Sequence, residues 1–153
     1  MKRLMSLMLA IVAASASAII IAGTPINQSE LPKAARSFIT KHFASEQVKK
    51  VEKDNGRRGM EYEVDFTSGA ELEFTSDGEW KEVKAARGQA VPAAIIPSGI
   101  AKYVSTNFSG LSIVEIARKR GGYEVELSNG SELKLTADGA PMQPRQGGRG
   151  RRN

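Results

Sequence analysis

The chain has 153 residues, of which 41% are hydrophobic and 25% are charged, a composition typical of one globular domain or two small ones. It contains no cysteine and one histidine, which excludes disulfides, a thiol nucleophile and a metal centre built from several imidazoles. The formal net charge of +5 belongs to the two ends of the chain, because residues 24–144 carry sixteen basic and seventeen acidic residues. We therefore expect no nucleic acid partner for the folded part.

Residues 1–23 have the pattern of a secretory signal peptide, with a basic start, an apolar run and small residues toward the end. Cleavage is expected after Gly23, or alternatively after Ala18. The run 4–22 also approaches the ~20 residues that a membrane span needs, so an uncleaved anchor is the alternative. Because there is no cysteine to carry a lipid, the sequence predicts a periplasmic or secreted protein without a lipoprotein anchor.

Two stretches of the chain, 62–78 and 123–139, have similar sequences, with identical residues at nine of the seventeen positions. Each stretch follows an apolar segment and, before that, a helical one. The fold class predicted is therefore α+β, with two tandem α-β-β-β-β repeats over 31–84 and 96–143, each a helix packed on an antiparallel sheet. Residues 24–30 and 85–95 are expected to be linkers. The tail 144–153, rich in arginine and glycine, has no apolar residue and is expected to be disordered.

Within the repeats, a proline opens each predicted helix, and hydrophobic residues then recur at helical spacing. The stripes are Ala35, Phe38, Ile39 and Phe43 in the first helix, and Ile100, Tyr103, Val104 and Phe108 in the second. Strands are expected near 47–54, 60–67, 70–76, 79–84, 111–119, 122–128 and 131–136, with a weak last one near 140–143. Gly69 and Gly130 are expected to supply the positive φ of tight hairpins. The two sheets, or their helices, are expected to pack together.

These residues resemble a known family. Leu31-Pro32 and Ile96-Pro97 before short helices, the YEV strands, the glycine turns and the Asp-Gly pairs are similar to the PepSY-like, beta-lactamase-inhibitor-protein-like periplasmic proteins, which occur as tandem repeats in Bacteroidetes. The similarity covers roughly residues 31–142. It implies an exported module that is not an enzyme, and it brings no known binding residue to this chain.

Alternation along the strands places a row of carboxylates on the outward faces of the sheets. This set comprises Glu63, Asp65, Glu71, Glu73, Glu124, Glu126 and Glu132. A solvated sheet face is the favoured interpretation, and an acidic surface for a basic partner or a weak calcium site is the alternative. We expect these groups to be too exposed for the separated pKa values that an acid-base pair requires, and we expect no metal or cofactor.

Positions where the two copies differ are the candidates for partner binding, because the shared positions all have a folding role. Trp80 faces Pro141 in the alignment of the repeats; packing over a sheet edge or the other repeat is favoured, and an exposed interface anchor is the alternative. The other candidates are the turn with Arg57 and Arg58 and the run Arg118, Lys119 and Arg120.

The sequence thus predicts an exported, non-catalytic binding module for an unknown protein of the periplasm or envelope, inhibitor-like or accessory. The alternative is a structural protein held at the envelope by its basic tail or by an uncleaved N-terminal segment. Four arginines of the tail would give weak contact with anionic lipid or polysaccharide, unless the tail only aids solubility. They are Arg145, Arg149, Arg151 and Arg152.

Overall fold

The computed structural model describes residues 23–56 and 59–142. In this part of the chain, eight antiparallel strands form one sheet in the order β1-β2-β3-β4-β5-β6-β7-β8, and two α-helices and two 3-10 helices complete the fold. The strands are β1 (Thr24–Pro25), β2 (Val48–Gly56), β3 (Gly59–Phe66), β4 (Glu71–Thr75), β5 (Trp80–Lys84), β6 (Ile113–Lys119), β7 (Gly122–Leu127) and β8 (Glu132–Leu135).

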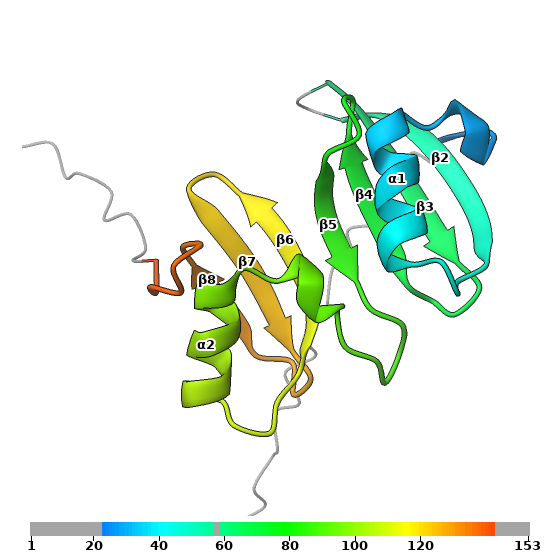
Figure 1. The fold of residues 1–153 in the computed structure, drawn as a ribbon. Helices are drawn as coiled ribbons and strands as arrows, with labels where there is room; N and C mark the ends of the chain where they lie inside the picture. The colour runs from blue at the N-terminus through cyan, green and yellow to red at the C-terminus, as the bar shows by residue number, and fades with distance from the viewer. Residues whose placement is uncertain (1–22, 57–58, 143–153) are drawn as a thin grey trace, which may run out of the picture.

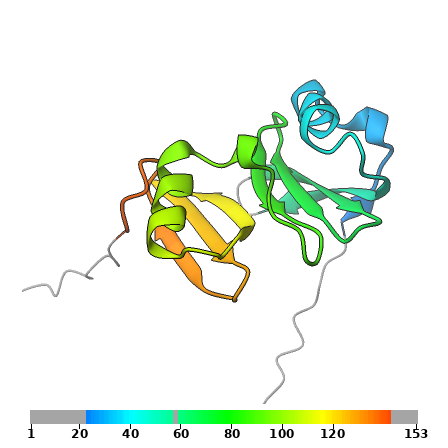
Figure 2. The same ribbon diagram turned by 60° about the horizontal axis from the view of Figure 1, so that its bottom comes forward.

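The helices α1 (Lys33–His42) and α2 (Ser98–Asn107) lie on the same face of the sheet, α1 over the first half and α2 over the second (Figures 1 and 2). Each begins directly after a proline, as predicted. Short 3-10 helices η1 (Gln28–Glu30) and η2 (Ala93–Ile95) precede them in the two segments predicted to be linkers. The helix-covered face of the sheet is therefore dry, and the other face, here called the open face, meets solvent.

The core forms between the helices and the sheet from the inward side of the period-two pattern. Phe43 of the first half stacks on Phe66 with ring centroids 5.4 Å apart, and Phe38 meets Phe74 edge-on at 5.6 Å. The side chains buried most completely are large and apolar: Phe66, Phe74, Leu72, Ile100, Ile116, Leu127, Leu135, Val64, Val83 and Val125. They come from both halves and belong to one continuous cluster.

The two halves join edge to edge rather than as two stacked sheets. In β5 and β6, Glu82 faces Ala117, Val83 faces Ile116 and Lys84 faces Glu115. The expectation of two separate sheets was therefore wrong. Pairing two edge strands satisfies backbone groups that would otherwise be open on both halves.

The strand expected near 140–143 is reduced to an isolated bridge between Leu135 and Pro141. Pro141 has no N–H to donate to a ladder, so regular pairing cannot continue through it. Met142 still donates its backbone N–H to the carbonyl of Lys134 at 2.8 Å, which lays the segment along the β8 edge. At the other edge, β1 has two residues, of which Pro25 is the second.

The repeated Asp-Gly pairs form turns against the helices. Gly78 and Gly139 have φ of 84° and 82°, so both need the left-handed conformation that glycine allows. A Cβ on Gly78 would lie 2.9 Å from the backbone nitrogen of Ala35 in α1, and one on Gly139 would overlap the backbone of Gly99 in α2. Both Asp-Gly pairs thus mark a close approach of a turn to a helix. The hairpin glycines Gly69 and Gly130 have φ of 89° and 83°, as predicted.

Candidate functional site

A pocket lies at the end of the sheet where β3 and β5 begin and β4 and β6 end. Its volume is about 550 Å³. We call it the junction pocket, because β5 and β6 are the strands that join the two halves. Its lining includes Met60, Glu61, Trp80, Arg118, Lys119 and Arg120. The structure thus brings Trp80 together with the run Arg118–Arg120, which the sequence placed among the candidates as separate positions.

Trp80 forms the apolar wall of the junction pocket. Its side chain is 8% exposed, so it packs as the sequence analysis favoured and does not project into solvent. The indole lies between the two halves, with ring centroids 6.4 Å from Phe38 and 6.2 Å from Tyr123. Arg118 covers it with its guanidinium carbon 4.1 Å from the ring centroid, a cation-π contact that also holds this arginine at the pocket.

The positive charges of the pocket differ in how firmly they are held. Lys81 donates to Glu61 at 2.7 Å and to Glu73 at 2.9 Å. Burial lowers the pKa of Lys81, and these hydrogen bonds outweigh it, so that the pKa is raised above its ordinary value. Arg118 reaches the exposed Glu79 at 3.5 Å.

Two cations of the pocket are held more loosely than Lys81. The Lys119 ammonium lies 3.9 Å from a carboxylate oxygen of Glu82, at the limit of an ion pair. Arg120, in the turn between β6 and β7, makes no ion pair with any described residue. Lys119 and Arg120 therefore keep donors free for a ligand.

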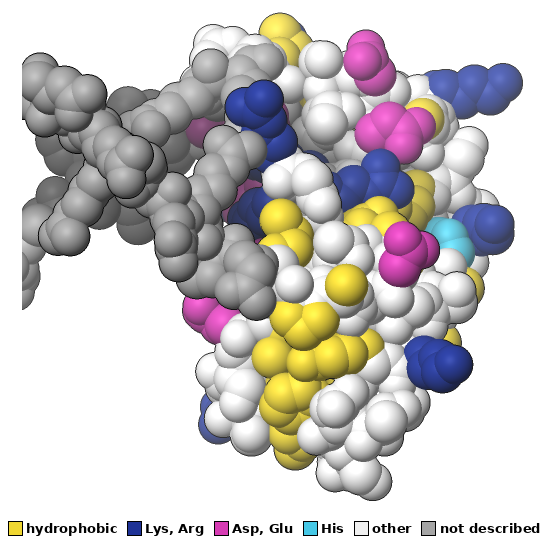
Figure 3. All heavy atoms as spheres, turned by 90° about the vertical axis from the view of Figure 1, so that its left-hand side faces the viewer, with side chains coloured by type: hydrophobic (Ala, Val, Ile, Leu, Met, Phe, Trp, Pro, Cys, Tyr) yellow, Lys and Arg dark blue, Asp and Glu magenta, His cyan; other side chains and the backbone are white. Residues whose placement is uncertain are grey.

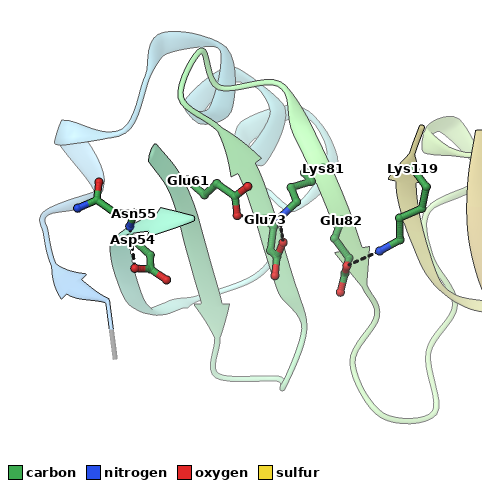
Figure 4. A network of polar contacts seen from close by, with 7 residues as sticks. All are labelled: Asp54, Asn55, Glu61, Glu73, Lys81, Glu82 and Lys119. Atoms are coloured by element: carbon green, nitrogen blue, oxygen red, sulfur yellow. Dashed lines mark hydrogen bonds and ion pairs between the residues drawn. The ribbon is translucent and has the colours of Figure 1, made fainter. Parts of the chain in front are cut away.

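On the open face, acidic side chains form rows across the strands. Glu52, Glu63, Glu73 and Glu82 lie opposite one another on four successive strands, β2 to β5. Figure 4 shows Glu61, Glu73 and Glu82 on this face, with Lys81 beside Glu73 and Lys119 beyond Glu82. Asp65 and Glu71 form part of a second row, in which Lys50 lies 3.4 Å from Asp65 and Lys84 lies 3.1 Å from Glu71. The predicted outward row is confirmed, and it is partly neutralised by lysines.

Of the predicted carboxylate set, Glu63 has a raised pKa, and raised pKa values also occur at Glu82 and Glu115, which the set did not include. Burial, and then repulsion from Glu73 and Glu115, raises the pKa of Glu82 to about 7. Burial and the charge of Glu126 likewise raise the pKa of Glu115, and burial with the charge of Asp65 raises that of Glu63. The sequence carried a signal for this, since Glu82 and Glu115 each sit in an alternating strand, but their adjacency depends on the β5–β6 pairing.

The remaining candidates of the sequence analysis fall outside the described residues. These are Arg57 and Arg58 and the tail arginines Arg145, Arg149, Arg151 and Arg152, together with residues 1–22 of the predicted signal peptide 1–23. Among residues 23–56 and 59–142, no helix is long and apolar enough to cross a membrane. The same residues contain no group of three or more histidines or carboxylates arranged to hold a metal ion.

A second hollow of similar volume, about 550 Å³, lies at the opposite end of β5 and β6. It is lined largely by small residues of the connection after β5, such as Ala85, Ala86 and Gly88, and no aromatic side chain contributes to it. The surface on the α2 and β8 side carries a group of hydrophobic side chains (Figure 3). Tyr103 of α2 and Leu133 of β8 are only partly buried. The junction pocket is distinguished from both by combining an aromatic wall with several cations.

In the described residues, an eight-stranded antiparallel sheet with two α-helices on one face defines an α+β fold of the PepSY-like type. The chain belongs to this family: the model described as "Putative beta-lactamase-inhibitor-like, PepSY-like" matches residues 20–64 and 60–141. The resemblance seen in the sequence is confirmed.

Solved structures of Bacteroides proteins resemble this one. A protein of Bacteroides thetaiotaomicron described as a "putative calcium-regulated periplasmic protein" is 37% identical, with a TM-score of 0.73, and the match covers 78% of this chain and 94% of that one. A "putative periplasmic protein" of Bacteroides vulgatus, from a family designated DUF2874, gives the same values. Another from that species, of unknown function, is 36% identical with a TM-score of 0.72 over 76% and 93% of the two chains. No curated protein matches the chain.

Proposed function

We propose that this protein is an exported, non-catalytic module of the periplasm that binds another envelope protein through the junction pocket. One observation carries the proposal. Trp80 and the cations Arg118, Lys119 and Arg120 come from positions where the two halves of the sequence differ, and they line the same pocket. Residues that the two halves share build the fold, whereas Arg118, Lys119 and Arg120 lie at exposed positions outside the core. Trp80 has both roles, as part of the core and as the apolar wall of the pocket.

Export is supported by the signal pattern of residues 1–23 and by the periplasmic description of the similar structures. A non-catalytic role is supported by the description of the family, which names no enzymatic activity. We also propose that the two halves are copies of one helix-and-strand unit, since nine of seventeen positions in 62–78 and 123–139 are identical and both Asp-Gly turns pack against a helix.

Calcium is a variable that the binding test should control. One relative is described as calcium-regulated, and the open face of this chain is rich in carboxylates. Lys50, Lys81 and Lys84 already occupy positions between these carboxylates, which weakens the attraction for a cation. Binding should therefore be measured with calcium and with a chelator.

The test is site-specific photo-crosslinking in the native periplasm. A photoreactive phenylalanine analogue in place of Arg120 should crosslink to a defined partner, and the same analogue in place of Arg87, an exposed residue beyond the other end of β5, should not. The same pattern of crosslinks from both positions would overturn the assignment of binding to the junction pocket.

Two further measurements separate the alternatives. Mass spectrometry of the mature N-terminus should find cleavage after Gly23 or Ala18, and an intact Met1 on protein recovered from the soluble cytoplasm would contradict export. The structural alternative, attachment through the basic tail, predicts that deleting residues 145–153 releases the protein from the envelope while crosslinks from position 120 are absent. Trp80→Ala is a poor test of binding, because removing a side chain that is 8% exposed would destabilise the fold.

A further inference from the structure

We infer that the junction pocket takes an acidic peptide segment, one in which a carboxylate side chain neighbours an aromatic or large aliphatic one. The inference rests on the proposed function, since it names the chemistry of the partner at the same site. It is drawn from the walls of the pocket, from the balance of charge around it and from the charge of the surface beside it.

The apolar part of the pocket suits an aromatic or aliphatic side chain of the ligand, in addition to its carboxylate. Met60 and Trp80 line it, and the flat guanidinium of Arg118 lies 4.1 Å above the indole. Arginine stacked on tryptophan presents an apolar surface edged with N–H donors, which matches an aromatic or aliphatic group next to a carboxylate. A pocket of about 550 Å³ has room for one or two such side chains.

The charge balance within the pocket favours an anionic ligand. Lys81, Arg118, Lys119 and Arg120 face two lining carboxylates, Glu61 and Glu79. Glu61 is engaged by Lys81 at 2.7 Å, and Glu79 is 66% exposed and 3.5 Å from Arg118, so that this weak pair can be replaced by a carboxylate of the ligand. Lys119 and Arg120 add donors that are not firmly held.

The surface beside the pocket discriminates between ligands by the sign of their charge. The row of Glu63, Glu73 and Glu82 on the open face repels an acidic segment from the sheet and leaves the cationic end as the favourable place for it. A basic segment would be attracted to the row instead. The two surfaces together therefore orient an acidic partner.

The experiment titrates the full mature protein with three capped peptides, Ac-Glu-Phe-Glu-NH2, Ac-Gln-Phe-Gln-NH2 and Ac-Lys-Phe-Lys-NH2. Because the chain contains a single tryptophan, the fluorescence of Trp80 reports directly on the pocket. The acidic peptide should change this fluorescence saturably, with a Kd about ten-fold lower than that of the neutral peptide, and the basic peptide should give no saturable change. Raising NaCl from about 50 to 300 mM should weaken the acidic peptide about five-fold.

Charge variants locate the binding. Arg120→Glu should weaken the acidic peptide about ten-fold, whereas Arg87→Glu, with the same change in net charge at the other end of the sheet, should leave its Kd unchanged. Glu79→Gln should strengthen binding about two-fold, because it removes the carboxylate that competes for Arg118. Circular dichroism and thermal unfolding check that each variant is folded.

Several outcomes overturn the inference. They are equal binding of the acidic and basic peptides, equal effects of the two arginine variants, no binding of any peptide, and a response to phosphatidylglycerol vesicles in place of peptides. Failure of the proposed function looks different. If position 120 crosslinks to a periplasmic partner but the acidic peptide does not bind, the proposed binding site is retained and the inferred acidic character of its ligand is rejected.

Discussion

Glu82 on β5 lies directly opposite Glu73 on β4, and the pairing of β5 with β6 adds the charge of Glu115 to its surroundings. Burial raises the pKa of Glu82, and repulsion from Glu73 and Glu115 raises it further, while Lys119 and Lys81 oppose the shift. The net result is a pKa of about 7. Below that pH the folded protein thus holds a proton on Glu82 that an unfolded chain would release near the ordinary pKa of 4.5.

The raised pKa of Glu82 predicts that the protein is less stable at pH 8 than at pH 5. The folded pKa of Glu82 is raised above its unfolded value of 4.5, so the stabilisation is fully present below about pH 4.5 and is lost as the pH rises through about 7. We expect a loss of about 1–2 kcal/mol in the free energy of unfolding, after allowance for solvent screening. Urea denaturation at intervals of pH measures it.

The matched variants for the pH prediction are Glu82→Gln and Glu132→Gln. Glu82→Gln should flatten the profile and raise stability at pH 8, whereas Glu132→Gln, in an exposed position of β8, should leave the profile as in the wild type. His42 acts in the opposite direction, because burial and then Lys41 lower its pKa, but it titrates below about 6.5. A wild-type profile that is flat between pH 6.5 and 8 would contradict the assignment.

Lys81 is predicted to stabilise the open face by bridging Glu61 and Glu73. Lys81→Met keeps the aliphatic stem and removes the charge, and should cost about 1–2 kcal/mol at low salt, with the deficit shrinking as added salt screens the carboxylates. Lys134→Met is the control, because Lys134 is 66% exposed and 3.8 Å from Glu124. That change should cost less than about 0.5 kcal/mol, and equal costs for both would argue against the bridge.

Arg118 is predicted to shield Trp80 from solvent. Arg118→Ala should shift the tryptophan emission to longer wavelength and increase its quenching by acrylamide about two-fold, because the guanidinium 4.1 Å from the ring is removed. Arg120→Ala removes a neighbouring arginine that is not stacked on the ring, and should leave both quantities close to the wild type. Identical quenching in the two variants would mean that the stacking does not persist in solution.

Gly99 is predicted to be indispensable for the contact between α2 and the Asp138-Gly139 turn. A Cβ at this position would overlap the backbone of Asp138 and lie 2.6 Å from the carbonyl oxygen of Ala137. Gly99→Ala should therefore cost about 3 kcal/mol, since backbone cannot move aside as a flexible side chain can. Thermal or urea unfolding gives the value.

Gly130→Ala is the comparison for Gly99→Ala. Gly130, unlike the helical Gly99, has a positive φ, of 83°, and a Cβ there would meet nothing within 4 Å. Its cost should be that of the backbone conformation alone, about 1 kcal/mol. If Gly99→Ala is no more costly than Gly130→Ala, the close approach in the structure is not maintained in solution.

Local pattern was sufficient to predict most of the elements. The prolines marked the helix starts, alternation gave β2 to β8 within a few residues, and Gly69 and Gly130 marked two hairpins, because all of these depend on neighbours in sequence. The edge-to-edge pairing of β5 with β6 could not be predicted in this way. This pairing joins two strands separated in sequence by the whole of α2, and no residue in either strand specifies the strand with which it pairs.

For the same reason, the candidate residues were found one by one and not as a site. Trp80 and Arg118 were singled out because the repeats differ there, yet their contact exists only through the β5–β6 junction. Alternation along β5 and β6 places Glu82 and Glu115 on the outward face of their strands. The effect of Glu115 on the pKa of Glu82 depends on the same strand pairing, so the raised pKa could not be predicted from either strand alone.

The two ends of the sheet have a consequence for how the protein behaves when crowded. At one end β1 stops after Pro25, and at the other the chain turns back so that Pro141 and Met142 lie along β8. A sheet formed by edge-to-edge pairing of strands could go on pairing with the edge strands of other molecules and so form fibres. Proline at both edges of this sheet lacks the N–H that such pairing needs, which limits the width of the sheet and favours separate molecules over fibres.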